Sequence, residues 1–165
     1  MSPESSKLKF HAAERMISFV ELIDEILGYV KTDPNRHYSL MIGSDSRASD
    51  ETEIITAVAI WKIGNGGRYF WTKSEVERCP TLRDRIYKEA MKSITLAQEI
   101  RSVLKDRVGE DFLWDNKISV HIDVGEVGPT KEFKESVLGM AKGFGFDAVI
   151  KPEAVAAFVV ADRHT

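Results

Sequence analysis

The sequence predicts an α/β domain built on a mixed sheet with helices on its faces. Three strand-like segments follow one another with short loops between them, and the chain then alternates between helical and strand-like segments. Strands joined by short loops pair antiparallel, whereas strands joined through a helix pair in parallel. With 165 residues the chain is long enough for a sizeable core, and we expect one domain over residues 1–165.

Residues 1–36 are expected to form a helical extension before the sheet. Residues 1–10 are polar and should fray. Between Ala12 and Val30 apolar residues recur at helical spacing, which predicts one amphipathic helix. The turn signal Thr32-Asp33-Pro34-Asn35 ends this helix.

The first three strands are predicted at Tyr38 to Ser44, Glu53 to Ile63 and Arg68 to Thr72. The second is rich in Ile, Val and Thr, which favour strands. Gly64-Asn65-Gly66-Gly67 is a hairpin signal between the second and the third. We therefore expect an antiparallel meander.

The rest of the chain is expected to alternate helices with strands. The predicted order is a helix from Leu82 to Lys105, a strand from Ile118 to Val124, a helix from Thr130 to Gly143 or Gly145, a strand from Phe146 to Lys151, and a last helix from Pro152 to about Asp162. The glycine-rich stretch 139–145 follows a helix, so it is interpreted as a helix end and not as a phosphate-binding loop.

The composition is that of an ordinary globular protein, with 43% hydrophobic and 30% charged residues. No apolar stretch reaches the roughly 20 residues of a membrane span, and no secretory leader opens the chain. We therefore expect a cytoplasmic protein without a membrane partner. The net charge of −3 argues against coating nucleic acid by bulk electrostatics. The single cysteine, Cys79, excludes an internal disulfide and a multi-cysteine zinc site.

Two aspartates stand where predicted strands end. Asp45 follows the first strand, and Asp123 ends the fourth, on the strand face that also carries His121. If these strands are parallel neighbours, their carboxyl ends meet, and both carboxylates face one crevice. Crevices beyond the carboxyl ends of such strands are favoured ligand sites.

Two helical acids complete the candidate group. Glu89 falls at the edge of the apolar face of the predicted helix that begins at Leu82, so it can reach the sheet, whereas Asp84 and Glu99 point toward solvent. Asp162 lies at the carboxyl end of the last helix, where the helix dipole disfavours an acid. Converging carboxylates repel one another, and Mg²⁺ or Mn²⁺ relieves that repulsion. Two such ions can activate water for attack on a phosphodiester.

Each acid has a structural alternative. Asp45 and Asp123 could serve only as turn residues. Glu89 and Asp162 could be solvated surface acids paired with neighbouring basic side chains. The spacing of the acids leaves these readings open.

Five stretches carry a resemblance to a known family: IGSDS (42–46), LRDRIYKEAMKSITLAQ (82–98), HIDVG (121–125), GMAKGFGFDAVIKPEA (139–154) and VADRHT (160–165). With the preceding helix they cover nearly the whole chain. The chain resembles the ribonuclease-H-like fold and, more narrowly, the YkuK-like family of uncharacterised bacterial ribonuclease-H-related proteins.

This resemblance implies a five-stranded mixed sheet in the order 3-2-1-4-5, with strand 2 antiparallel to the others. It also implies an acidic metal site, with Asp45 as the first-strand aspartate, Glu89 as the helix glutamate, Asp123 as the fourth-strand aspartate and Asp162 as the C-terminal acid. His164 could assist proton transfer or could be a tail residue, and His121 is either a site residue or a hydrogen-bonded strand histidine.

The sequence leaves three functional hypotheses. The first is a metal-dependent nuclease or phosphodiesterase, with RNA, DNA or a hybrid as the partner. The second is a non-enzymatic nucleic-acid- or protein-binding module, and the third is a phosphatase acting on a small metabolite.

The basic handle loop of ribonuclease H proper is missing, and fold alone does not fix function. Oligomeric state stays open. A phosphate-contacting rim is predicted at Arg47, Arg78, Arg83, Arg85, Lys88 and Lys92.

Overall fold

The computed structural model describes residues 1–151, which form a mixed sheet with helices packed against it. The strands are β1 (Lys9–Ala12), β2 (Arg15–Ser18), β3 (Tyr38–Ser46), β4 (Glu51–Thr52), β5 (Ile54–Lys62), β6 (Gly66–Lys73), β7 (Glu77–Arg78), β8 (Lys117–His121) and β9 (Asp147–Val149). The helices are α1 (Phe19–Lys31), α2 (Leu82–Val108), α3 (Glu110–Asp115) and α4 (Lys134–Gly143), with single 3₁₀ turns at Ser5–Lys7 and Lys131–Phe133. The predicted helix after Pro152 lies outside the described residues.

The main sheet confirms the predicted α/β class and the predicted order of its central strands. Its full order is β2-β1-β6-β5-β3-β8-β9. The five strands from β6 to β9 reproduce the order 3-2-1-4-5, because β5 pairs antiparallel with both of its neighbours while β8 pairs in parallel with β3 and β9. Two strands, β1 and β2, extend this sheet beyond the predicted edge.

The N-terminal segment corrects the predicted helical extension. Residues 9–18 form a hairpin, and the helix begins only at Phe19. Ser18 and Glu21 form a capping box, in which each side chain bonds the backbone N–H of the other, so the chain cannot continue as a helix before Ser18. Met16, which the helical pattern placed on the apolar face, lies on β2 with 52% of its surface exposed.

The hairpin turn gives a stability prediction. Ala13 has φ of 55°, in the left-handed region that a side chain disfavours. We expect Ala13→Gly to raise the free energy of unfolding by about 0.5–1 kcal/mol, because glycine adopts this conformation without steric strain. Ala12→Gly is the matched control, since Ala12 is buried in the extended strand β1 and its change to glycine should lower stability. Urea denaturation of both variants measures the two effects, and a lower stability of Ala13→Gly would contradict the prediction.

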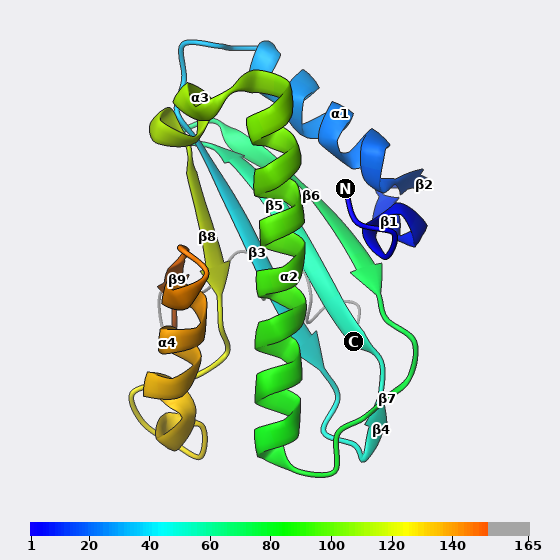
Figure 1. Cartoon of the computed structure of the whole chain (residues 1–165), viewed down its shortest axis with the longest axis vertical. Coiled ribbons are helices and arrows are strands. Elements are labelled where there is room, and N and C mark those ends of the chain that lie inside the picture. The colour runs from blue at the N-terminus through cyan, green and yellow to red at the C-terminus, as the bar shows by residue number, and fades with distance from the viewer. Residues whose placement is uncertain (152–165) are drawn as a thin grey trace.

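The helices α1, α2 and α4 cover one face of the sheet (Figure 1). The main hydrophobic core lies between this face and the helices, and it includes Ile23 of α1, Ile42 of β3, Ile94 of α2 and Val120 of β8. The opposite face carries two smaller buried clusters, at Met41 with Ala59 and at Ile55 with Ala57. The central strand β3 therefore has buried side chains on both faces.

The later elements match the predicted ones with shifted ends. Helix α2 begins at Leu82 as predicted and is followed, after Gly109, by the unpredicted short helix α3. Helix α4 starts at Lys134, later than Thr130, and the glycine-rich stretch ends it as predicted, with Gly145 at φ of 82°. Among the described residues, no helix is long and apolar enough to cross a membrane.

Candidate functional site

The carboxyl ends of β3 and β8 bring Asp45 and Asp123 to one end of the sheet. The parallel register pairs Met41 with Ser119 and Gly43 with His121. Asp45 lies two residues after Gly43 within β3, whereas β8 ends at His121, short of the predicted Val124, so Asp123 lies two residues beyond the strand. The Val124 N–H donates to the carbonyl of Ile122 at 2.8 Å, so the chain turns at Asp123. The Ile122 N–H donates to the carbonyl of Val149 at 2.9 Å, which holds the chain after β8 against the sheet. Both strands point the same way in Figure 1.

Glu89 reaches this end of the sheet from α2, as its helical position predicted. Its side chain is buried, with 7% of the residue exposed. The Ser46 hydroxyl donates to Glu89 Oε1 at 2.6 Å, and Arg85 Nε lies 3.9 Å from the same oxygen. Ser46 is the last residue of β3, so this hydrogen bond ties the helix acid to the strand end that carries Asp45.

The acids from the three elements interact electrostatically. Burial, the largest cause, and the negative charges of Asp45 and Asp123 together raise the pKa of Glu89 to about 8, against the lowering effects of the Ser46 hydrogen bond and Arg85. A carboxyl group with this pKa is mostly protonated at neutral pH. It also lies close enough to both aspartates to sense their charge.

A buried row of hydroxyl groups underlies Glu89, and the sequence analysis did not identify it as part of the site. The Ser44 hydroxyl shares hydrogen bonds with Thr56 at 2.9 Å and with Ser93 at 2.7 Å. Strand alternation in Ser44-Asp45-Ser46 turns both serines toward α2 and Asp45 toward the opposite face. The same alternation could have been used to predict from the sequence that both serines face α2.

Asp123 has a cationic partner that the sequence did not reveal. Lys151 Nζ lies 2.5 Å from Asp123 Oδ1. The Lys151 N–H also donates to the carbonyl of Val124 at 3.0 Å, so the lysine is fixed beside the strand end by its backbone. An ammonium group thus neutralises Asp123 in this structure.

Three of the four acids predicted to hold a metal, Asp45, Glu89 and Asp123, lie within the described residues. Within residues 1–151, no three His, Cys, Asp or Glu side chains are arranged to hold a metal ion together. Asp45 and Glu89 flank the same strand end from opposite sheet faces. Asp162 and His164, the other predicted site residues, lie outside the described residues.

Burial shifts the pKa values of two further titratable groups near the site, and each shift favours the neutral form. Burial lowers the pKa of His121 to about 4, with a further contribution from Lys117, so its imidazole is neutral at physiological pH. His121 Nε2 and the Ser119 hydroxyl lie 3.3 Å apart, as expected for a hydrogen-bonded strand histidine. Burial also raises the pKa of the Cys79 thiol, which disfavours the reactive thiolate.

A hollow of about 540 Å³ adjoins Asp45 on its own sheet face. Asp45 pairs with Ile55, and Ile55 pairs with Lys73 on β6, so the three residues form a row across neighbouring strands. The hollow is lined by Arg47, Ser49, Glu51, Thr52, Glu53, Ile55, Lys73 and Val76. Two strand spacings of about 5 Å separate Lys73 from Asp45. Arg47 and Lys73 bring positive charge to this hollow, and Glu51 and Glu53 bring an equal negative charge, with Lys73 Nζ 3.4 Å from Glu53 Oε2.

The basic residues predicted as a rim on α2 have contacts within the protein. Arg85 pairs with Glu89, Lys92 Nζ lies 3.4 Å from Glu77, and Lys88 Nζ donates to the carbonyl of Arg78. Arg85 and Lys92 are thus engaged by the carboxyl groups of Glu89 and Glu77. The rim itself stays a prediction.

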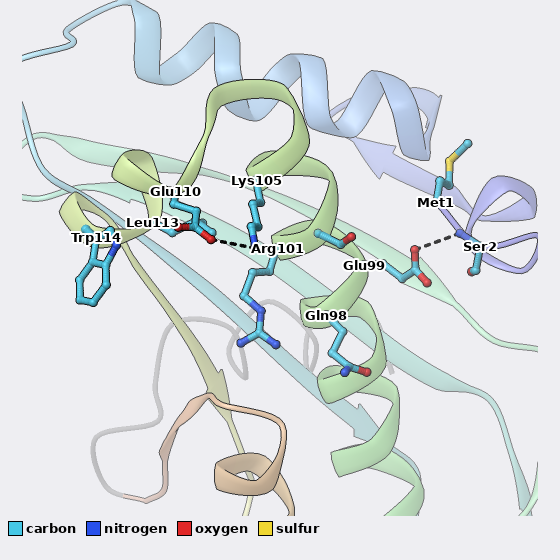
Figure 2. Close-up of a pocket in the computed structure, with 10 residues that line it drawn as sticks. Met1, Ser2, Gln98, Glu99, Arg101, Lys105, Glu110, Leu113 and Trp114 are labelled. Atoms are coloured by element: carbon cyan, nitrogen blue, oxygen red, sulfur yellow. Dashed lines mark hydrogen bonds and ion pairs between the residues drawn. The ribbon is translucent and has the colours of Figure 1, made fainter.

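A larger hollow, of about 850 Å³, lies elsewhere, and none of the predicted acids lines it. Figure 2 shows it along the C-terminal half of α2 and beside α3, with Trp114 at one end and Ser2 at the other. Arg101 donates to the carbonyls of Phe144 and Gly145, and Lys105 Nζ pairs with Glu110 at 2.8 Å, so its cations are engaged. Size alone does not make this hollow the site.

Comparison with known proteins places the chain in a family. Residues 21–165 match the family described as ribonuclease H-like. The chain is also similar to the uncharacterized protein YkuK of Bacillus subtilis (strain 168), with 30% identity over 170 residues that cover 97% of this chain and 98% of that protein. No solved structure matches the chain.

The sheet order and the family match define a ribonuclease H-like protein. More narrowly, the chain belongs to the YkuK-like group of the ribonuclease H-like family. This confirms the resemblance carried by the IGSDS and HIDVG stretches. Membership in this family is compatible with a nuclease-like role.

Proposed function

We propose that this protein is a divalent-metal-dependent nuclease or phosphodiesterase that acts at the carboxyl ends of β3 and β8. The observation that carries the proposal is the placement of the buried Glu89, which bonds Ser46 at the strand end that carries Asp45; its raised pKa, to which burial and the charges of Asp45 and Asp123 contribute, agrees with this placement. Acids from separate elements that destabilise one another's charge are typical of functional sites. A divalent cation would relieve this repulsion.

The donor chemistry of the site fits Mg²⁺ or Mn²⁺. Carboxylate oxygens are the ligands that these hard cations prefer. Lys151 already places a positive charge against Asp123 Oδ1, which marks a position where a cation is stabilised. Asp45, Glu89, Asp123 and Asp162 would hold the metal. A bound pair of such ions supplies an activated water and stabilises the charge on the leaving oxygen.

The remaining steps belong to residues of the chain. Ser46 orients Glu89 Oε1 through its hydrogen bond. Arg47 and Lys73 would contact phosphates that flank the scissile bond, because they line the hollow beside Asp45. Each such contact should also make binding depend on salt concentration.

The proposal is tested by incubating the protein with RNA, DNA and an RNA–DNA hybrid in Mn²⁺, Mg²⁺ or EDTA. We expect cleavage of at least one substrate in Mn²⁺ and none in EDTA. Cleavage that persists in EDTA would contradict the metal dependence. Absence of cleavage for all three substrates would contradict the nuclease assignment, and a panel of small phosphoesters then tests the phosphatase reading.

A non-enzymatic nucleic-acid-binding module is the alternative. It is favoured by one observation, that the acids within residues 1–151 do not form a metal-holding group. Thermal denaturation with added Mn²⁺ separates the two functions. A metal site gives about 2.7 kcal/mol of stabilisation at 100 times the dissociation constant, whereas a binding module without the site gives no metal-dependent shift.

A further inference from the structure

A further cleft, separate from the two hollows described above, lies between the N-terminal hairpin and β6, away from the acids. It has a volume of about 370 Å³ and is lined by Ala12, Ala13, Arg15, Glu25, Gly67, Arg68, Tyr69 and Phe70. The row through Arg68 crosses β5 at Ile60 and β3 at Leu40. Leu40 precedes Asp45 on β3 by about 16 Å of strand. The cleft is therefore distinct from the proposed nuclease site.

Two guanidinium groups share one carboxylate in this cleft. Arg15 Nη2 donates to Glu25 Oε1, and Arg68 Nη1 lies 3.5 Å from Glu25 Oε2. The arginine side chains are 58% and 52% exposed, whereas that of Glu25 is 26% exposed. Among residues 1–151, neither guanidinium has another carboxylate within ion-pair distance. The group carries one excess positive charge and has donors that face solvent.

The two arginines are held in place before any ligand binds. Arg15 stands opposite Ala12 in the hairpin register, so β1 and β2 fix its position. The Arg68 guanidinium lies 5.0 Å from the centroid of the Tyr29 ring, a favourable cation–π arrangement. The Tyr29 hydroxyl in turn donates to the carbonyl of Gly66 at 3.2 Å. Preorganised donors bind more tightly, since less freedom is lost on binding.

We propose that this cleft binds the phosphate group of a nucleotide. The planar fork of a guanidinium matches the oxygens of a phosphate, and a dianion can bridge both arginines. Tyr69 follows Arg68 on β6, so its side chain projects to the opposite sheet face, and the two guanidinium groups supply the ligand contacts. The cavity volume lies in the range of small-ligand sites. The phosphate can belong to a free nucleotide or to a nucleic-acid strand.

Isothermal titration calorimetry of the full chain tests the proposal with three probes: inorganic phosphate, adenosine monophosphate and a short single-stranded oligoribonucleotide. We expect Arg15→Ala and Arg68→Ala each to weaken binding about tenfold or more, because each removes a charge-assisted hydrogen bond. Arg107→Ala is the matched control, since Arg107 forms a similarly exposed pair with Asp24 at 2.7 Å outside the cleft. The control should bind as the unchanged protein does.

One variant distinguishes a ligand site from a structural ion-pair cluster, and a second is a control. Glu25→Gln should strengthen phosphate binding, because it removes the negative charge that competes with the ligand. Tyr69→Ala should leave binding of both inorganic phosphate and the nucleotide unchanged, because the Tyr69 side chain projects to the opposite sheet face from Arg68. Weaker phosphate binding by Glu25→Gln would show that the arginines serve only Glu25, and would overturn the proposal.

The probes also identify the source of the phosphate. Adenosine monophosphate binding as tightly as the oligoribonucleotide indicates a free nucleotide, and binding of the oligoribonucleotide alone indicates a strand phosphate. The proposal is overturned if none of the three probes binds. It is also overturned if a variant that carries both Arg15→Ala and Arg68→Ala binds them as the unchanged protein does. Asp45→Asn should leave this binding unchanged, so failure of the nuclease assignment and failure of this site are separate results.

Discussion

Asp45→Asn is expected to abolish metal-dependent cleavage while leaving the fold intact. The amide has nearly the shape of the carboxylate but lacks its charge, and the site depends on that charge to hold divalent cations. We expect a loss of about 100-fold or more, the scale on which removal of one charge-stabilising group acts. The stabilisation by Mn²⁺ should disappear in the same variant.

Asp147→Asn is the matched control for this experiment. Asp147 lies on the neighbouring strand β9, with 74% of its side chain exposed, and pairs with Lys117 at 3.8 Å. Its loss should change neither cleavage nor the response to Mn²⁺. Circular dichroism and urea denaturation of both variants check that the fold is retained. Cleavage by Asp45→Asn at the rate of the unchanged protein would remove the proposed mechanism.

The central sheet and the positions of the aspartates could be predicted because they follow from local patterns. Gly64 to Gly67 forces a tight turn, so β5 and β6 must be antiparallel neighbours. Strand alternation then determines the sheet face on which Asp45 lies, because Asp45 is within β3. The edge position of Glu89 on α2 follows from helical spacing in the same way.

The hairpin at residues 9–18 could not be predicted from periodicity alone. Met16, Phe19, Val20 and Ile23 recur at helical spacing, so the helical pattern continues back from α1 into β2. The strand is selected by contacts outside the segment, such as the pairing of His11 with Trp71 on β6 and the stacking of their rings at 3.7 Å. The capping box at Ser18 was readable in the sequence and favours a helix start at Phe19.

The side chains that contact the acids could not be predicted from the sequence either. Which side chain neutralises Asp123 depends on how closely β9 approaches β8, and Lys151 is 28 positions further along the chain. The hydrogen bond from Ser46 to Glu89 depends on the depth at which α2 packs against β3. Sequence patterns predict the face and the end of an element, whereas these contacts depend on distances between elements.

Glu89 should make the protein less stable as the pH rises. Its pKa is raised from 4.5 to about 8 by folding, chiefly through burial. Below pH 4.5 both states hold the proton, and the full stability is present. As the pH rises toward 8, the unfolded state releases its proton while the folded state keeps it. Stability then falls by roughly 1.4 kcal/mol per pH unit, and the loss is complete above the folded pKa.

Glu89→Gln should remove this pH dependence. Glutamine has the shape of the protonated acid and can still accept the hydrogen bond from Ser46, so the two proteins should have similar stability near pH 5. By pH 9 the variant should be more stable by on the order of 4 kcal/mol, measured by urea denaturation in EDTA. His121, whose pKa of about 4 makes stability fall as the pH falls below 6.5, affects both proteins equally and cancels in the difference. An equal pH dependence of the two proteins would show that Glu89 is ionised in the folded state, and it would remove the raised pKa of Glu89 from the support for the nuclease proposal.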